Sequence, residues 1–128
     1  MQRVQEDGEL RGPLLPEGVL PDEEDWHPRT RQWWETWRRA PQAQMFIETD
    51  WDFLLDTALL HHVMWTKGRW EFASEVRLRA AKYGATPEDR MRLKLKIETP
   101  VDKPPAEPTP RSTSDRRKNL RIVSEDAV

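Results

Sequence analysis

The sequence predicts an all-α fold: a small helical domain of three to four helices with a disordered leader before it and a proline-rich linker and tail after it. Three observations lead to this prediction. The stretch 49–66 can bury a wide apolar face as one helix. All seven tryptophans lie between Trp26 and Trp70, which concentrates the core there. The 11 prolines and 34% charged residues mean that much of the remaining chain cannot be core.

These features divide the chain into four parts. Residues 1–25 form a flexible acidic leader, because prolines, glycines and acids break any period and two basic residues stand against eight acidic ones. Residues 26–98 form the helical core domain. Residues 99–114 hold five prolines and form an extended linker. Residues 115–128 form a basic C-terminal tail, whose character is that of a docking segment.

The first helix is predicted over residues 29–39. Pro28 suits the first helical turn, where its missing N–H would have no partner, and Pro41 stops the run. Trp33, Trp34 and Trp37 share one face and can pack against the next helix. A connector over residues 42–48 follows, with a helical turn expected to place Met45, Phe46 and Ile47 under the core.

The second helix is predicted over residues 49–66. Thr49 is expected as the N-cap, with Asp50 in the first turn and Asp52 as the carboxylate of a capping box. Gly68 is expected to end the helix. The apolar stripe contains Trp51, Leu54, Leu55, Ala58, Leu59 and His62.

A third helix over 70–83 closes at Gly84, with Trp70, Ala73, Val76, Ala80 and Tyr83 on its inner face. Thr86 then opens a fourth helix over 86–94, since Pro87 and Asp89 complete the start signal.

Residues 91–97 also alternate between apolar and basic side chains, which is the pattern of a strand. A short strand at 91–97 therefore remains an alternative. It would require pairing between protomers, because a lone apolar edge strand aggregates.

No catalytic, metal or cofactor site is predicted. The chain has no cysteine, and adjacent His61 and His62 point about 100° apart on a helix, so they are expected in the core. Asp52 and Asp56 are expected on a solvated face. No nucleophile with its base and no phosphate-binding glycine loop is present, so the protein is not expected to be an enzyme. Without an apolar run of membrane-spanning length or a signal peptide, a cytoplasmic protein is expected.

The basic residues around the junction of the third and fourth helices are the candidate DNA-binding residues. Two helices joined by a short glycine-containing turn have the general form of a helix-turn-helix, and cations around it can contact phosphate. The set is Arg77, Arg79, Lys82, Arg90, Arg92, Lys94 and Lys96.

Residues 26–95 resemble the small terminase subunit of tailed bacteriophages, of the type found in phages of actinobacteria. The motifs that carry this resemblance are Thr49, Asp50, Trp51 and Leu54, then Glu75, Arg77 and Arg79, then the run 83–92. The resemblance implies a non-catalytic protein that binds viral DNA, assembles into a ring and delivers the DNA to a large subunit carrying the ATPase and nuclease.

On this basis the sequence predicts a small terminase subunit that binds double-stranded viral DNA and delivers it to the large terminase subunit for genome packaging in the host cell cytoplasm. Its ring would be a homo-oligomer, for which residues 91–97 are the candidate element. The candidate residues for binding the large subunit are Arg116, Arg117, Lys118, Leu120, Arg121 and Ile122. The alternative is a DNA-free helical interaction module, such as a phage adaptor or a host-factor binder.

Overall fold

The computed structural model describes residues 1–99 of the chain. Its helices and strands are β1 (Gln2–Gln5), η1 (Pro21–Glu23), α1 (Pro28–Arg39), η2 (Pro41–Met45), α2 (Glu48–Lys67), η3 (Trp70–Phe72), α3 (Ala73–Ala81), α4 (Pro87–Arg92) and β2 (Leu95–Glu98). The predicted mostly helical fold is confirmed, with one two-stranded sheet added. The predicted tail, 115–128, and all but the first residue of the predicted linker lie outside the described residues.

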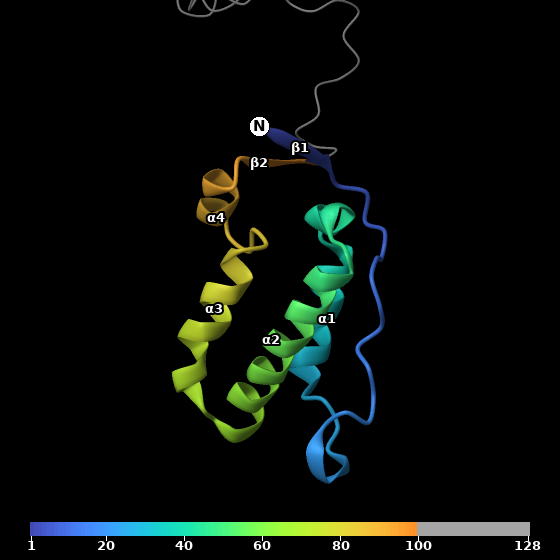
Figure 1. Cartoon of the computed structure of the whole chain (residues 1–128), viewed down its shortest axis with the longest axis vertical. Helices are drawn as coiled ribbons and strands as arrows, with labels where there is room; N and C mark the ends of the chain where they lie inside the picture. Colours follow the sequence, from blue (N-terminus) through green and yellow to red (C-terminus); the bar gives the residue numbers. More distant parts are fainter. Residues whose placement is uncertain (100–128) are drawn as a thin grey trace, which may run out of the picture.

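The central helix α2 packs against both α1 and α3 (Figure 1). Leu54, Thr57 and Ala58 on α2 are completely buried, and the neighbouring His61 and His62 are buried with them. The buried stripe is narrower than predicted, because Leu59, which was expected in it, is more than a third exposed.

The ends of α2 show one correct and one wrong prediction. Gly68 ends the helix in the left-handed conformation with φ of 65°, as predicted. The start is two residues earlier than predicted: the N-cap position is Ile47, and the Asp50 carboxylate accepts its backbone N–H at 2.9 Å. Thr49 therefore lies inside the first turn, because a carboxylate at the third helical position can satisfy the N-terminal backbone without a capping hydroxyl.

Tryptophan side chains form much of the core. Trp26, Trp34, Trp37 and Trp51 are all at most 7% exposed, and the Trp34 and Trp51 rings lie 5.5 Å apart between centroids. Phe46 joins them from the connector, with its ring 5.3 Å from Trp51. Met45 and Ile47 were expected beside it, but they are 43% and 66% exposed, and the apolar side chain that η2 buries is that of Ala43.

The prediction of a flexible leader is wrong for residues 1–25. This segment runs along the side of α1 and α2 opposite α3 (Figure 1), and it buries Val4, Leu15 and Leu20. The indole N–H groups of Trp26 and Trp34 donate to the carbonyls of Pro16 and Pro13, at 2.7 and 2.9 Å. The prolines that break any helical pattern thus supply carbonyl acceptors for the tryptophans of the core.

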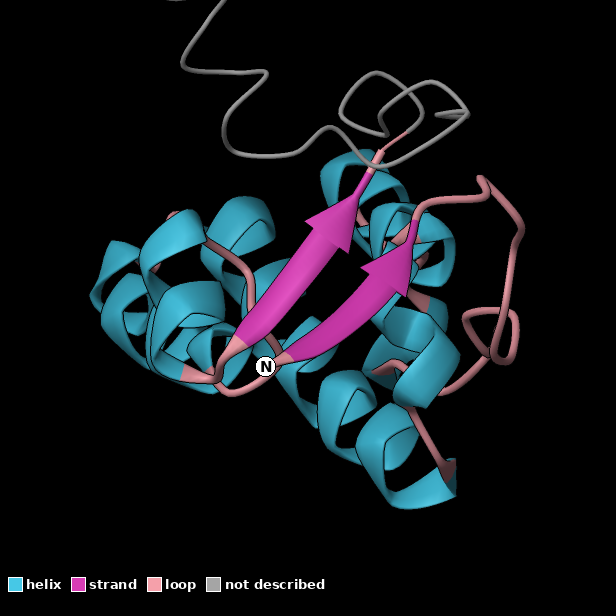
Figure 2. Ribbon diagram, turned by 90° about the horizontal axis from the view of Figure 1, so that it is seen from above, coloured by secondary structure: helices cyan, strands magenta, loops and turns pink. Residues whose placement is uncertain are grey.

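The strand β1 at the start of the leader pairs in parallel with β2, with Val4 opposite Ile97. Figure 2 shows the two strands side by side across the ends of the helices. The strand alternative at 91–97 is thus correct only for its second half, and the pairing lies within the chain rather than between protomers. A parallel pair needs a long crossover, which the helical region 28–92 supplies here.

The third predicted helix is divided in two. Residues Trp70–Phe72 form the short helix η3, and α3 begins only at Ala73. Val76 and Ala80 face inward as predicted, but Trp70 is 56% exposed and does not belong to the inner face. Gly84 has φ of 77° and closes the turn after α3 as predicted.

Candidate nucleic-acid interface

The junction between α3 and α4 is held by hydrogen bonds to the carbonyl of Gly84. The buried Gln42 amide donates to this oxygen at 2.9 Å and to that of Tyr83 at 3.2 Å. The Arg90 guanidinium donates to the same Gly84 oxygen at 2.8 Å. A Cβ at Gly84 would lie 3.0 Å from Arg90 Cγ, so the turn has little space for a larger residue. The junction is therefore rigid.

The start of α4 follows the predicted capping box. The Asp89 N–H donates to Thr86 Oγ1 at 3.2 Å, and the Asp89 carboxylate accepts the Thr86 N–H at 3.1 Å. The helix then runs for only six residues. At 1.5 Å per residue this is about 9 Å, which is short for a helix that reads base edges in the major groove.

Three of the predicted DNA-binding cations have partners within the fold. Arg90 holds Gly84, as described above. Arg79 pairs with Glu75 at 2.8 Å and lies over the Phe53 ring at 5.6 Å. Arg92 donates to the Ala81 carbonyl at 3.3 Å. Arg90 and Arg92 thus have partners at the junction, and Arg79 has partners on α3 and α2.

The other four predicted cations are exposed, and none of them forms an ion pair with a carboxylate of residues 1–99: Arg77, Lys82, Lys94 and Lys96. They come from α3, from its C-terminal cap, from the turn after α4 and from β2, which follow one another along one side and the top of the molecule in Figure 1. The fold thus places four exposed positive charges on consecutive elements.

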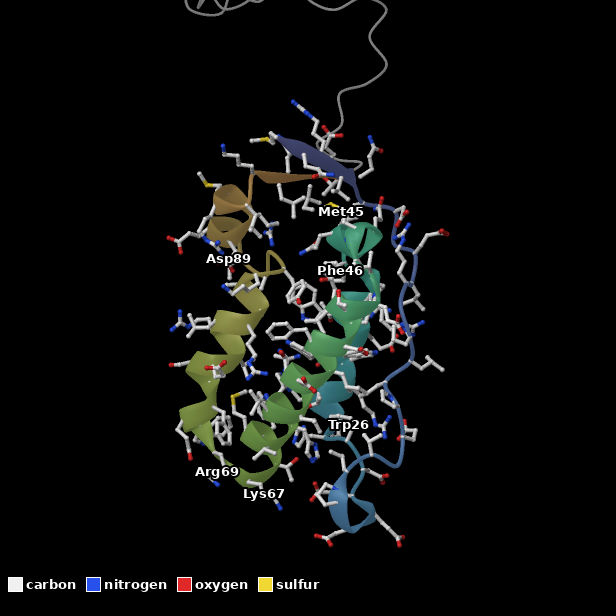
Figure 3. The ribbon with its side chains drawn as sticks, in the orientation of Figure 1. Trp26, Met45, Phe46, Lys67, Arg69 and Asp89 are labelled. Atoms are coloured by element: carbon white, nitrogen blue, oxygen red, sulfur yellow. The ribbon has the colours of Figure 1, made fainter. Side chains whose placement is uncertain are left out.

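Acidic residues gather at the other end of the molecule. Asp22, Glu23 and Asp25 are exposed on and beside η1, which lies at the end of the molecule opposite the sheet (Figure 1). Figure 3 shows Asp89 at the sheet end and Lys67 and Arg69 at the η1 end. Two cations at this end are paired with carboxylates: Lys67 lies 3.7 Å from Glu24, and Arg69 donates to Glu71 at 2.5 Å.

The central histidines are core residues, as predicted. His61 stacks on Trp33, with ring centroids 5.1 Å apart, and its Nδ1 lies 2.8 Å from the Thr30 hydroxyl. Burial lowers the pKa of His61 to about 4, so its ring is neutral at pH 7. His62 Nδ1 accepts the His27 N–H at 3.0 Å, and Nε2 lies 2.7 Å from a Glu24 oxygen. This hydrogen bond lowers the pKa of the Glu24 carboxyl.

Metal binding has no support in the part of the chain that the structure describes. Asp52 and Asp56 are exposed on α2, and no group of three metal-ligating side chains occurs within residues 1–99. The same residues contain no helix that is long and apolar enough to cross a membrane.

The residues that position the interface were mostly missed by the sequence reasoning. Gln42 stands in what reads as a connector, 42 residues before the glycine it contacts. The prolines and glycines before Trp26 were the available signal for the leader, but these residues are equally typical of an unstructured terminus. The predicted partner-binding residues from Arg116 to Ile122 lie outside the described residues.

The structure thus defines a small helical protein with exposed lysines on β2 and on the turn before it. The chain belongs to the phage terminase small subunit family, whose model matches residues 1–121. The predicted family is confirmed, and with it a role in phage genome packaging and a subunit that is not catalytic. No curated protein and no solved structure matches the chain.

Proposed function

We propose that the chain binds viral double-stranded DNA through phosphate contacts along α3, the α3–α4 junction and β2, and delivers it to the large terminase subunit. Family membership implies an association with the large subunit and DNA during packaging. The observation that carries the proposal is that four of the seven predicted DNA-binding cations are exposed and form no ion pair with a carboxylate of residues 1–99: Arg77, Lys82, Lys94 and Lys96. Cations of this kind can bind phosphate without first breaking an ion pair.

Phosphate contacts fit this surface better than base recognition by α4. The helix is about 9 Å long, and two of its arginines are held by backbone carbonyls of the junction. Long lysine side chains on β2 and on the turn before it can follow a phosphate backbone without entering a groove. The proposed binding is therefore mainly independent of sequence.

The test compares two double variants of the full chain. Lys94→Ala with Lys96→Ala removes two unpaired cations at the sheet. Lys67→Ala with Arg69→Ala removes two cations that are paired with Glu24 and Glu71. If each lysine at the sheet displaces one counterion, the slope of log K against log salt becomes less steep by about 2 in the first variant and stays unchanged in the second. Equal slopes in both variants would remove this surface from the proposal.

The C-terminal stretch 111–128 is proposed to engage the large subunit in the host cell cytoplasm. Its cluster of basic and apolar residues supports this role: Arg116, Arg117, Lys118, Leu120, Arg121 and Ile122. Deletion of 111–128 should abolish co-purification with the large subunit while the far-UV circular dichroism of the core is retained. Undiminished co-purification of the deleted chain would contradict the role.

A homo-oligomeric ring is proposed to form through apolar side chains at the η3 end. Trp70 is 56% exposed and Trp65 is 39% exposed, and their rings meet edge to face with centroids 5.5 Å apart. Exposed tryptophans are frequent anchors of protein interfaces. The same observation favours the second candidate function, an interaction module that does not bind DNA. Light scattering of the full chain tests the ring, and a mass of one chain at micromolar concentration would contradict it.

A further inference from the structure

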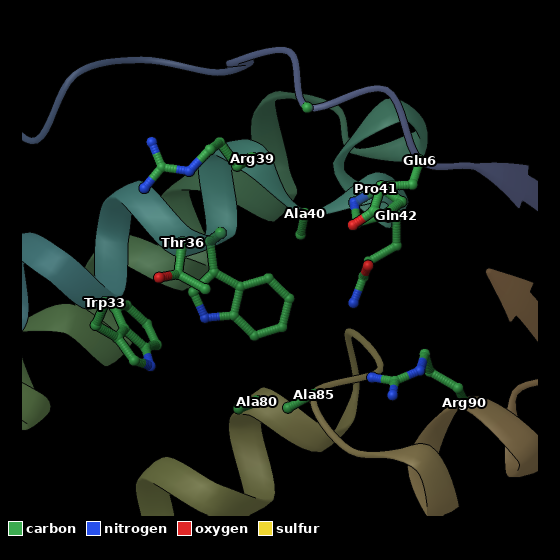
Figure 4. Close-up of a pocket in the computed structure, with 12 residues that line it drawn as sticks. Glu6, Trp33, Thr36, Arg39, Ala40, Pro41, Gln42, Ala80, Ala85 and Arg90 are labelled. Atoms are coloured by element: carbon green, nitrogen blue, oxygen red, sulfur yellow. The ribbon is translucent and has the colours of Figure 1, made fainter. Parts of the chain in front are cut away.

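A groove of about 540 Å³ opens between α1 and the α3–α4 junction (Figure 4). It exists because α1 and α3 both pack on α2 and do not close on each other. The wall formed by α1 includes Trp33 and Trp37, and the opposite wall includes Ala80 and Ala85. Trp33 is only half-buried in residues 1–99, so part of its indole faces the groove. An aromatic wall facing small side chains leaves room for an extended peptide.

The described chain ends beside this groove. The Glu6 N–H donates to the Glu98 carbonyl at 2.8 Å, and Glu6 and Gly8 line the groove. Residue 99 therefore follows directly from the mouth of the groove. Any segment after Thr99 is held there at a high effective concentration, because the connection is only a few residues long.

The sequence after Thr99 has the composition that aromatic grooves bind. Residues 100–108 contain Pro100, Pro104, Pro105 and Pro108 and no glycine. Pro105 and Pro108 have the spacing of a P-x-x-P motif. Such segments prefer the polyproline II conformation, and proteins recognise it with grooves lined by aromatic side chains because little entropy is lost on binding.

The length and the charges of residues 100–108 also fit the groove. Nine residues in polyproline II extend about 28 Å at about 3.1 Å each. The groove wall from Ala40 to Trp33 is about 10 Å of helix at 1.5 Å per residue. Arg39 and Arg90 at the rim provide positive charge for Asp102, and Glu6 provides negative charge for Lys103. The segment is therefore long enough to cross the whole groove, and the rim offers oppositely charged partners for Asp102 and Lys103.

We propose that residues 100–108 of the same chain dock in the groove between α1 and the α3–α4 junction, with their prolines against Trp33 and Trp37. This docking is independent of DNA binding. It covers the apolar wall of the groove and fixes the path on which the basic tail leaves the domain.

The test uses a single spin label in the full chain. The sequence has no cysteine, so Thr109→Cys provides one site for a nitroxide just after the motif. The spin-labelled chain also carries ¹⁵N in its tryptophans. It is diluted into an excess of chain that has neither label, so that broadening between chains is suppressed. We expect the indole signals of Trp33 and Trp37 to be broadened more strongly than the other five. Uniform broadening, or none at these two residues, would overturn the proposal.

Two variants separate docking from simple tethering. Thr36→Trp fills the groove from an exposed position on α1 and should abolish the selective broadening, while the tether remains. Gln32→Trp is the matched control, because it adds the same side chain at an exposed position of α1 that does not line the groove. It should leave the broadening unchanged. Loss of broadening in both variants, or in neither, would contradict docking in this groove.

A second experiment puts the nitroxide and the ¹⁵N on different chains and distinguishes a segment of the same chain from other occupants of the groove. In this experiment a ¹⁵N chain without a nitroxide is mixed with a chain that carries the nitroxide but no ¹⁵N. If the indole signals of Trp33 and Trp37 are still broadened selectively, a second copy fills the groove and docking within one chain is refuted. If the broadening is absent in the isolated chain and Trp33 shifts only when the large subunit is added, the occupant is the large subunit. That result would overturn the proposal as well.

Discussion

The docking of the leader on the core can be tested at Gly12, where the backbone approaches Trp51. A Cβ at Gly12 would overlap the Cε2 and Cζ2 atoms of the indole and lie 2.8 Å from Cδ2. Trp51 is 7% exposed and packs against the rings of Trp34 and Phe46, so it has no space to withdraw. Gly12→Ala must therefore either strain the core or release the leader.

The matched control is Gly18, which belongs to the same segment. Its φ of 74° equals that of Gly12 within one degree, yet nothing lies within 4 Å of a Cβ placed there. Gly18→Ala should cost only the left-handed conformation, about 1–2 kcal/mol. Gly12→Ala should cost this amount plus an overpacking term of about 1–3 kcal/mol.

The assay is urea denaturation followed by tryptophan fluorescence and far-UV circular dichroism. Hydrogen exchange at the Arg11 N–H, which is bonded to the Arg38 carbonyl at 2.9 Å, reports separately on release of the leader. The expected result is a larger loss of unfolding free energy, or faster exchange at Arg11, in Gly12→Ala than in Gly18→Ala. Equal stability and equal exchange in the two variants would show that the leader does not pack on Trp51.

Two further predictions concern buried polar groups. The folded-state pKa of His61, about 4, lies below its ordinary value of 6.5, so the unfolded chain binds the proton more strongly. The contribution of His61 to the free energy of unfolding should be fully present above pH 6.5 and be lost as the pH drops toward 4. At 1.36 kcal/mol per pKa unit the loss is at most about 3 kcal/mol. Urea midpoints from pH 7.5 to 4.5 measure this, and His61→Asn should flatten the slope; a wild-type midpoint that does not change with pH refutes the reasoning. Gln42→Leu leaves two carbonyls of the α3–α4 junction without their amide donor and should cost about 1–3 kcal/mol in thermal or urea unfolding. Gln44→Leu removes only an exposed bond to the Gln5 carbonyl and should cost less than 1 kcal/mol, so equal losses would contradict a role of Gln42 at the junction.

Local signals allowed much of the helical region to be predicted. Pro28, Gly68, Gly84 and the Thr86 capping box mark boundaries that depend on the backbone of a few neighbouring residues, and the structure has each of them at the predicted place. The conflict between helix and strand after Thr86 was also visible. The structure resolves it by using both in succession, with Lys94 at φ of 58° as the turn between them.

The candidate interface was only partly predictable, because charge alone does not show which cations are already paired. All seven basic residues look equivalent in the sequence. Arg79, Arg90 and Arg92 are held by Glu75 and by backbone carbonyls, and only the fold shows this. The unpaired cations can be identified only when the carboxylates and carbonyls around each one are placed in space.

The sequence by itself determined the family, the positions of the helices and the tryptophan core, since these follow from periodicity, capping residues and the concentration of large apolar side chains between Trp26 and Trp70. The tertiary structure decided the course of residues 1–25. Val4 pairs with Ile97, which lies at the other end of the described sequence, and the backbone of Gly12 lies against the Trp51 indole. Such contacts join residues far apart in the chain, and neither partner carries a local pattern that names the other.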